Sequence, residues 1–321
     1  MIFFESRKVL NKKLLFFAFF IFCSTSLCAQ KMNGDTGAYY NIRCPKLARP
    51  LMERWIAEYS KVNPEVQLRL AKGCSSGREN MRVIVRRRTA ERGRSIMYFG
   101  QYAMLPITTQ GSDAEKLLNE KPLSIERLKK VFFDKSAEDY EDEYEVQEDN
   151  NSPTKNIVVY SGNDTTSLAG QFAAFFGETV SNIRGKRISG DDAFLNNAIA
   201  DDPMGVTFNA LSNIYDLQRR KLKDNLSLLR LNIEGDVADV IRNDASLDDM
   251  IAALEQSDSE SVPTAEIGIE FDNSDGVARD FLQWVISQGT KYNHQYGMLT
   301  LNERIAMQQA EKVRNRDTAQ K

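Results

Sequence analysis

Segments with helix-like and strand-like apolar patterns alternate along this chain of 321 residues. From Leu47 to Lys61 the apolar side chains recur every four positions, which predicts an amphipathic helix. Val66, Leu68 and Leu70 then alternate with polar residues, which predicts a strand. Chains that alternate in this way fold as helices packed on a sheet with many parallel neighbours. The pattern therefore predicts an α/β fold with mixed, mostly parallel sheets.

The same alternation continues through the rest of the sequence. Strands are predicted at Met97–Ile107, Ile157–Tyr160, Gly205–Phe208, Leu228–Leu231 and Ala265–Phe271. Helices are predicted at Leu123–Phe133, Leu168–Phe176, Leu247–Glu255, Val277–Gly289 and Leu301–Arg316. The segment beyond Arg78 is predicted to be helical, and the arginine-rich run from Arg82 to Arg94 to form a solvated helix face and loop.

The segment from Glu138 to Asp149 has eight acidic residues in twelve. A stretch with so much like charge and so few apolar residues has no means of building a packed core. We expect an exposed, mobile insertion at about residues 138–152. A calcium-binding loop is the alternative, but the acidic residues lack EF-hand spacing and its central glycine.

The first 29 residues have the three parts of a secretory signal sequence. Four basic residues precede the unbroken apolar run Leu14–Cys23, and a cleavage site after Ala29 follows it. A helix of that apolar run is only ~15 Å long, too short for the ~30 Å hydrocarbon core of a bilayer. The sequence therefore predicts a cleaved signal peptide, residues 1–29, and a periplasmic protein. Lipidation at Cys23 or Cys28 is not expected, because a large apolar residue precedes each cysteine.

Charge and histidine content exclude several classes of function. The formal net charge is −3, so nothing predicts a nucleic-acid partner. The chain has a single histidine, His294. Histidine-based zinc sites, a Ser-His-Asp triad and a Cys-His dyad are not expected, because each needs imidazole as a ligand or base. We expect a monomer that is not an enzyme, without catalytic residues, metal or cofactor.

Two cysteines, Cys44 and Cys74, follow the predicted cleavage site. In an oxidising compartment such a pair is more often a disulfide than a nucleophile or a metal site. The sequence leaves two interpretations open, a disulfide and two buried free thiols.

Two turns rich in serine and threonine follow predicted strands. The first is Cys74-Ser75-Ser76-Gly77, and the second is Asp164-Thr165-Thr166-Ser167. If each turn opens a helix, unpaired N–H groups, the helix dipole and the hydroxyls together form a cradle for an anion. Ordinary helix capping is the alternative, because Ser, Thr and Asp are preferred N-cap residues.

Several motifs stand in a shared order along the chain and resemble those of the phosphate-binding proteins of ABC importers. The resemblance implies a type II periplasmic-binding fold, with two α/β lobes joined by a hinge of two crossovers. The matching motifs are Pro50 five residues before Trp55, the turn Cys74–Gly77, the segment Ile157–Gly177 with Thr165-Thr166-Ser167, the stretch Val262–Phe271, Phe281–Trp284 with Gly289, and Tyr296–Leu299.

The resemblance also implies domain boundaries. Residues 30–105 together with 263–321 would form lobe 1, and residues 106–262 would form lobe 2. Cys44 and Cys74 would then follow adjacent parallel strands, where their Cα atoms could lie within the ~4.4–6.8 Å that a disulfide needs.

By the same resemblance, a small phosphate-like anion would bind between the lobes and be delivered to a membrane transporter. The ligand-binding residues implied by the match are Lys46, Leu47, Ser75, Ser76, Gly77, Thr165, Thr166 and Ser167.

Two departures from the family pattern bear on the ligand. Ser161 stands where the family has an arginine that pairs with phosphate. Met97–Gly100 stands where the family has a segment with an aspartate that accepts the proton of the bound anion. Lys46 or Arg78 would have to supply the positive charge. The alternative function is therefore an accessory protein of an envelope complex that kept the fold but lost the phosphate pocket.

Overall fold

The computed structural model describes residues 39–71, 79–85, 89–134, 153–163, 168–233, 241, 244–256 and 262–314 of the chain. The predicted signal peptide, the acidic insertion, Cys74 and both serine- and threonine-rich turns lie outside these residues, so those predictions are untested. No helix within the described ranges has the length and apolar character needed to cross a bilayer.

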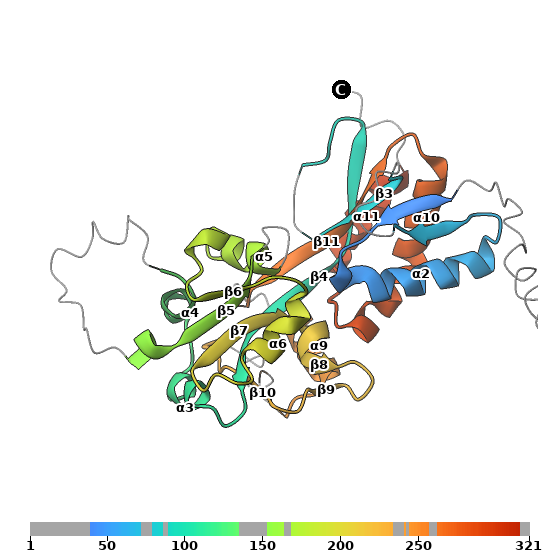
Figure 1. Ribbon diagram of the computed structural model, residues 1–321. Coiled ribbons are helices and arrows are strands. Elements are labelled where there is room, and N and C mark those ends of the chain that lie inside the picture. The colour runs from blue at the N-terminus through green and yellow to red at the C-terminus, as the bar shows by residue number, and fades with distance from the viewer. Residues whose placement is uncertain are drawn as a thin grey trace, which may run out of the picture. The chain divides into compact units, whose positions relative to one another are not determined.

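A mixed sheet runs through the described chain, as Figure 1 shows. The strands lie in the order β2 (Leu68–Leu70), β1 (Tyr40–Arg43), β3 (Met81–Ile84), β11 (Thr264–Asp272), β4 (Arg94–Thr109), β7 (Gly205–Ala210), β5 (Val158–Gly162) and β6 (Lys186–Ile188). Outside this order, β10 (Leu226–Leu228) pairs with β4, and β8 (Tyr215–Asp216) pairs with β9 (Lys221–Leu222).

Strands β4 and β11 join two groups of strands (Figure 1). Residues 94–103 of β4 pair antiparallel with β11, and residues 104–109 pair antiparallel with β7 and β10. Toward the outer strands the pairing is parallel, β1 with β2 and β3 in the first group and β5 with β6 and β7 in the second. The centre is antiparallel because the chain leaves the first group along β4 and returns along β11. The predicted α/β fold with two crossovers is confirmed, and the sheet is parallel only in these outer pairs of the described strands.

Helices follow the strands largely where the periodicity predicts them. The longer ones are α2 (Arg49–Val62), α3 (Asp113–Asn119), α4 (Ile125–Phe132), α5 (Leu168–Phe175), α9 (Leu247–Gln256), α10 (Gly276–Trp284) and α11 (Glu303–Arg314). Short helical segments are η1 (Lys46–Ala48), η3 (Pro153–Asn156), η4 (Val180–Asn182), η5 (Asp192–Phe194), α6 (Leu195–Ala198), α7 (Leu211–Ile214), η6 (Val285–Gly289) and η7 (Thr290–Tyr296).

The core of the first group is built on the predicted apolar face of α2. Trp55 and Tyr59 are buried, and the Tyr59 ring lies edge-on to Phe281 of α10 with 5.1 Å between ring centroids. The indole Nε1 of Trp55 donates a hydrogen bond to the carbonyl of Gly289 at 2.7 Å. A β-carbon at position 289 would lie 3.1 Å from that nitrogen, so any larger residue would press on the indole unless it shifted by a few tenths of an ångström. The helix that carries Phe281 thus packs on α2.

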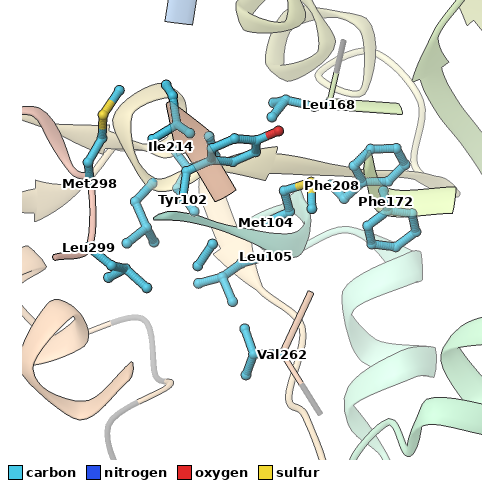
Figure 2. Packing of buried hydrophobic residues seen from close by; sticks show 14 of the residues in the cluster. Tyr102, Met104, Leu105, Leu168, Phe172, Phe208, Ile214, Val262, Met298 and Leu299 are labelled. Atoms are coloured by element: carbon cyan, nitrogen blue, oxygen red, sulfur yellow. The ribbon is translucent and has the colours of Figure 1, made fainter. Parts of the chain in front are cut away.

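The core of the second group is aromatic. The Phe172 ring of α5 stacks on Phe208 of β7 with 3.7 Å between centroids, and Figure 2 shows the two rings with Met104 of β4 next to them. The hydroxyl of Ser124 caps α4 by accepting from the N–H of Arg127 at 3.2 Å. The Phe172–Phe208 stack fixes α5 on the sheet, and the contact of Phe132 with Phe208, 5.7 Å between centroids, fixes α4.

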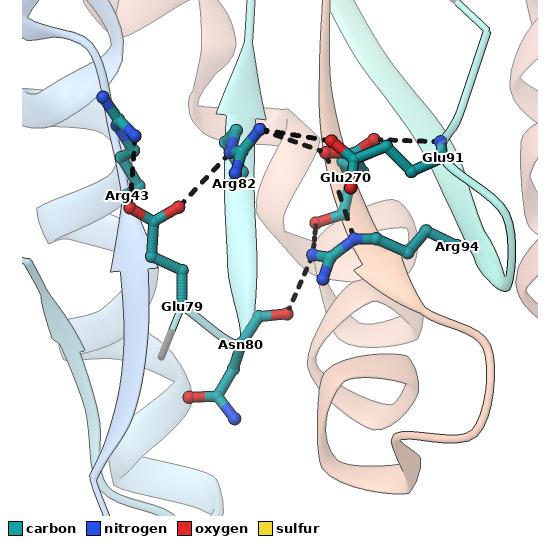
Figure 3. Close-up of polar contacts among 7 residues, drawn as sticks. All are labelled: Arg43, Glu79, Asn80, Arg82, Glu91, Arg94 and Glu270. Atoms are coloured by element: carbon teal, nitrogen blue, oxygen red, sulfur yellow. Dashed lines mark hydrogen bonds and ion pairs between the residues drawn. The ribbon is translucent and has the colours of Figure 1, made fainter. Parts of the chain in front are cut away.

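The prediction of a helix beyond Arg78 is wrong. Met81–Ile84 is strand β3, parallel to β1 and antiparallel to β11. Arg82 pairs in register with Glu270 of β11, whose buried carboxylate lies 3.9 Å from the Arg82 guanidinium, and Arg94 approaches the same carboxylate at 4.0 Å (Figure 3). A short strand at the start of an arginine-rich run resembles a solvated helix in sequence, because the charge partner of Arg82 comes from a strand far along the chain. The predicted Leu228–Leu231 strand is likewise shifted, to Leu226–Leu228.

Candidate ligand pocket

A pocket of about 300 Å³ lies where segments of both strand groups meet. Three loops or short helices form most of its wall: η1 after β1, the turn before η5, and α7. The described residues that line it are Pro45, Lys46, Leu47, Pro50, Val85, Tyr102, Leu168, Gly190, Asp191, Asp192, Ala193, Ser212, Asn213, Leu217 and Tyr296.

Lys46 and Leu47, two of the predicted ligand-binding residues, are in this wall. They follow β1 in the short helix η1, whose backbone turns at Pro45. The ammonium of Lys46 lies 3.3 Å from the carboxylate of Asp191, which belongs to the opposite wall. The side chain of Lys46 is 71% exposed and that of Asp191 28%. The ion pair therefore spans the pocket between the two groups of strands, while the ligand-binding role of Lys46 and Leu47 remains a prediction.

Asp191 and Asp192 are the acidic residues of the described wall. The carboxylate of Asp191 caps η5 by accepting from the N–H of Ala193 at 3.1 Å. The carboxylate of Asp192 accepts from the N–H of Leu168, the first residue of α5, at 3.4 Å. This N–H is one of the orphan donors that an anion would use at a helix start. The carboxylate of Asp192 therefore occupies one of the N–H donors at the start of α5, where the sequence predicts an anionic ligand.

A network of asparagine side chains holds the turn that carries both aspartates. The amide nitrogen of the fully buried Asn209 donates to the carbonyl of Asp192 at 2.7 Å and to the side-chain oxygen of Asn196 at 3.1 Å. Its oxygen accepts from the N–H of Ala210 at 2.9 Å and from the amide of Asn213 at 2.7 Å. All polar capacity of this buried side chain is used, so the turn before η5 is fixed to β7.

Tyr102 closes the inner end of the pocket. Its ring is buried, and its hydroxyl donates to the carbonyl of Val85 at 3.0 Å. Burial, and to a lesser degree the charge of Asp192, raise the pKa of this phenol well above its usual range. Tyr102 is therefore a neutral donor at any physiological pH. Its bond to Val85 ties β4 to the end of β3.

Ser161 does not line this pocket. It is fully buried in β5 and accepts a hydrogen bond from the guanidinium of Arg187 of β6 at 3.1 Å. Arg187 also donates to the carbonyl of Val180 at 2.9 Å. Ser161 therefore takes part in a contact between neighbouring strands. Neither Ser161 nor the Arg187 guanidinium bound to it is among the described residues of the pocket wall.

The remaining predicted site residues, Ser75, Ser76, Gly77, Thr165, Thr166 and Ser167, lie outside the described residues. The helix after the second turn is confirmed, because α5 begins at Leu168. The predicted helix after the first turn is replaced by β3.

Of the two cysteines considered for a disulfide, Cys44 is seen as a free thiol that donates to the carbonyl of Pro45 at 3.3 Å, and burial raises its pKa to about 12. Cys74 is not described, so the disulfide remains a prediction. Cys44 follows β1 and Cys74 follows β2, and these two strands are adjacent and parallel, as the resemblance implies.

The chain matches no protein-family model and no curated protein sequence. Its fold is similar to that of two solved binding proteins. One, from Clostridium perfringens, is described as a phosphate ABC transporter substrate-binding protein with bound phosphate; it has a TM-score of 0.55 and 12% identity, over 83% of this chain and 100% of that one. The other is an ABC-type phosphate transport receptor from Vibrio cholerae, with a TM-score of 0.53 and 11% identity, over 82% and 100%. The chain thus has the type II periplasmic-binding fold.

Proposed function

We propose that this chain is an exported solute-binding protein that captures a small solute in the pocket and presents it to a membrane partner. The observation that carries the proposal is that the pocket wall comes from both strand groups, with Lys46 of one facing Asp191 of the other at 3.3 Å. A solute seated there touches both groups at once. Such a solute favours the arrangement in which they are closest, which is the physical basis of closure by hinge motion.

A phosphate-like oxyanion is the ligand class predicted from the sequence, and the names of the two similar proteins support it. In the described wall Lys46 is the basic residue that could pair with such an ion. The two aspartates beside it oppose a doubly charged oxyanion, because like charges this close repel and each anion has to lose water on binding.

The charge of the wall also favours a second candidate function, an accessory protein of an envelope complex. In that case the pocket would hold no solute, and the Lys46–Asp191 pair would be a structural contact. Catalysis is not proposed, because the two solved proteins of similar fold are binding proteins.

Calorimetric titration of the mature protein with phosphate, sulfate and small organic solutes tests solute capture. Val85→Trp places a large side chain in the pocket wall and should reduce the affinity for any bound solute by about tenfold or more. Val62→Trp makes the same substitution at a site that is 63% exposed on α2 and should leave the affinity unchanged. Equal effects of the two substitutions on binding would contradict the pocket as the site.

A further inference from the structure

We infer that the solute carries a protonated amine, which binds the carboxylate of Asp191 in place of Lys46, and an apolar body that packs on Leu47, Pro50 and Val85. This inference rests on the proposed function and names the class of ligand for the same pocket.

Asp191 has the geometry of a receptor for an ammonium group. One of its oxygens is held by the N–H of Ala193 at 3.1 Å, which fixes the carboxylate on η5. The other oxygen faces the ammonium of Lys46 at 3.3 Å. That lysine side chain is 71% exposed and can return to water at little cost, because exposed ion pairs contribute little to stability. The ammonium of Lys46 therefore already occupies this oxygen of Asp191, and it is held only weakly.

Asp192 adds to the preference for a cation. Its carboxylate sits at the start of α5, on the N–H of Leu168, next to Asp191 along the chain. Lys46 is the basic side chain of the described wall, and Asp191 and Asp192 are its acidic ones. An amine that replaces Lys46 brings a positive charge next to these carboxylates. When an oxyanion enters, Lys46 has to leave Asp191 and two carboxylates remain close to the ligand.

The size and lining of the pocket fit an organic solute better than an inorganic ion. A volume of about 300 Å³ holds on the order of ten water molecules at ~30 Å³ each. A bare phosphate would fill only part of it. The apolar side chains of Leu47, Pro50, Val85 and Leu217 cover much of the wall and gain from contact with a hydrocarbon chain.

The experiment compares butylamine with butanol, which has the same hydrocarbon chain without the charge, by calorimetry at low ionic strength. Butylamine should bind about tenfold more tightly or better, because a hydrogen bond to a charged group is stronger than a neutral one. Asp191→Asn should abolish this difference while keeping the fold, since Asn and Asp are equally good N-cap residues for η5. Lys46→Gln removes the competing ammonium and should tighten butylamine binding.

Asp201→Asn is the matched control, because it makes the same charge change at an exposed position outside the pocket lining. It should leave the preference for butylamine intact. Inorganic phosphate in parallel distinguishes the two proposals. If phosphate binds, is strengthened by Asp191→Asn, and butylamine does not bind, the amine class is wrong and solute capture stands. If neither probe binds, the amine class is wrong; if sulfate and other small organic solutes also fail, the accessory function replaces solute capture.

Discussion

Asn209 is the residue on which the shape of the pocket wall most depends. Its side chain is fully buried and joins the carbonyl of Asp192 to the N–H of Ala210 and the amide of Asn213. Asn209→Ala leaves these buried groups without a partner, at about 1–3 kcal/mol for each unsatisfied group. We expect chemical denaturation to show a loss of about 3 kcal/mol or more in the free energy of unfolding, since three groups lose their partner. The exposed Asn197→Ala on α6 should change it little, and similar losses for the two variants would mean that the network contributes nothing.

Single residues of the site were predictable only where the resemblance to phosphate-binding proteins supplied them. Lys46 and Leu47 were implied by that match; they lie in η1, directly before α2, and both line the pocket. Asp191 and Asp192 were missed, because Gly190-Asp191-Asp192 in a loop has the composition of any turn. The signal that could have found them is the preference of aspartate for N-cap positions ahead of a short helix.

The contact of α9 with η7 and the residues after it should make stability depend on pH. His294 of η7 lies 2.9 Å from Glu255 of α9, which also accepts from the hydroxyl of Thr300 at 2.7 Å. The hydrogen bond to Glu255 raises the pKa of His294, against burial and the charge of Arg220, which lower it. A raised pKa in the folded state means that the stabilisation is complete below the ordinary histidine pKa of about 6.5 and is lost as pH rises through the folded value.

Denaturant unfolding of the unsubstituted protein and of His294→Gln, at pH values below and above about 6.5, measures how much the protonated His294 contributes to stability. The free energy of unfolding of the unsubstituted protein should fall relative to the variant as pH rises above about 6.5. Because His294 is the only histidine of the chain, no other imidazole contributes to the difference. A constant difference across the range would show that the Glu255 contact does not depend on protonation.

Elements with a long apolar period were predictable, and those defined by a distant partner were not. Helix α2 has the predicted buried positions Leu51, Trp55 and Tyr59, because a helix of 14 residues repeats its pattern over several turns. Strand β3 has four residues, and its register is set by β1 and β11. A strand of four residues with a single arginine carries no period long enough to distinguish it from a helix. The antiparallel centre of the sheet was missed for the same reason, since it arises from pairing between β4 and β11.

At the scale of the whole molecule, the carboxyl-terminal part of the chain completes a core that the amino-terminal part begins. Strand β11 lies between β3 and β4, and its residues Gly268–Phe271 pair with β3. The buried indole of Trp55 donates to Gly289, which lies 234 residues further along the chain. The first strand group therefore depends on contacts of high sequence separation, which form only when both parts of the chain are present.

Removal of residues 263–321 should abolish folding of the first strand group. The truncated chain lacks β11 between β3 and β4, and α2 loses Phe281, Trp284 and the acceptor for Trp55. Trp55 is then the remaining tryptophan, since the chain has two and Trp284 is removed. We expect its fluorescence to report a water-exposed indole and the amides of α2 to lose protection from hydrogen exchange. A chain ending at Arg314 keeps every described element and should retain the buried signal of Trp55. A buried Trp55 in the longer truncation would show that residues 39–109 form a core without β11, contrary to the role of this strand argued from its pairing.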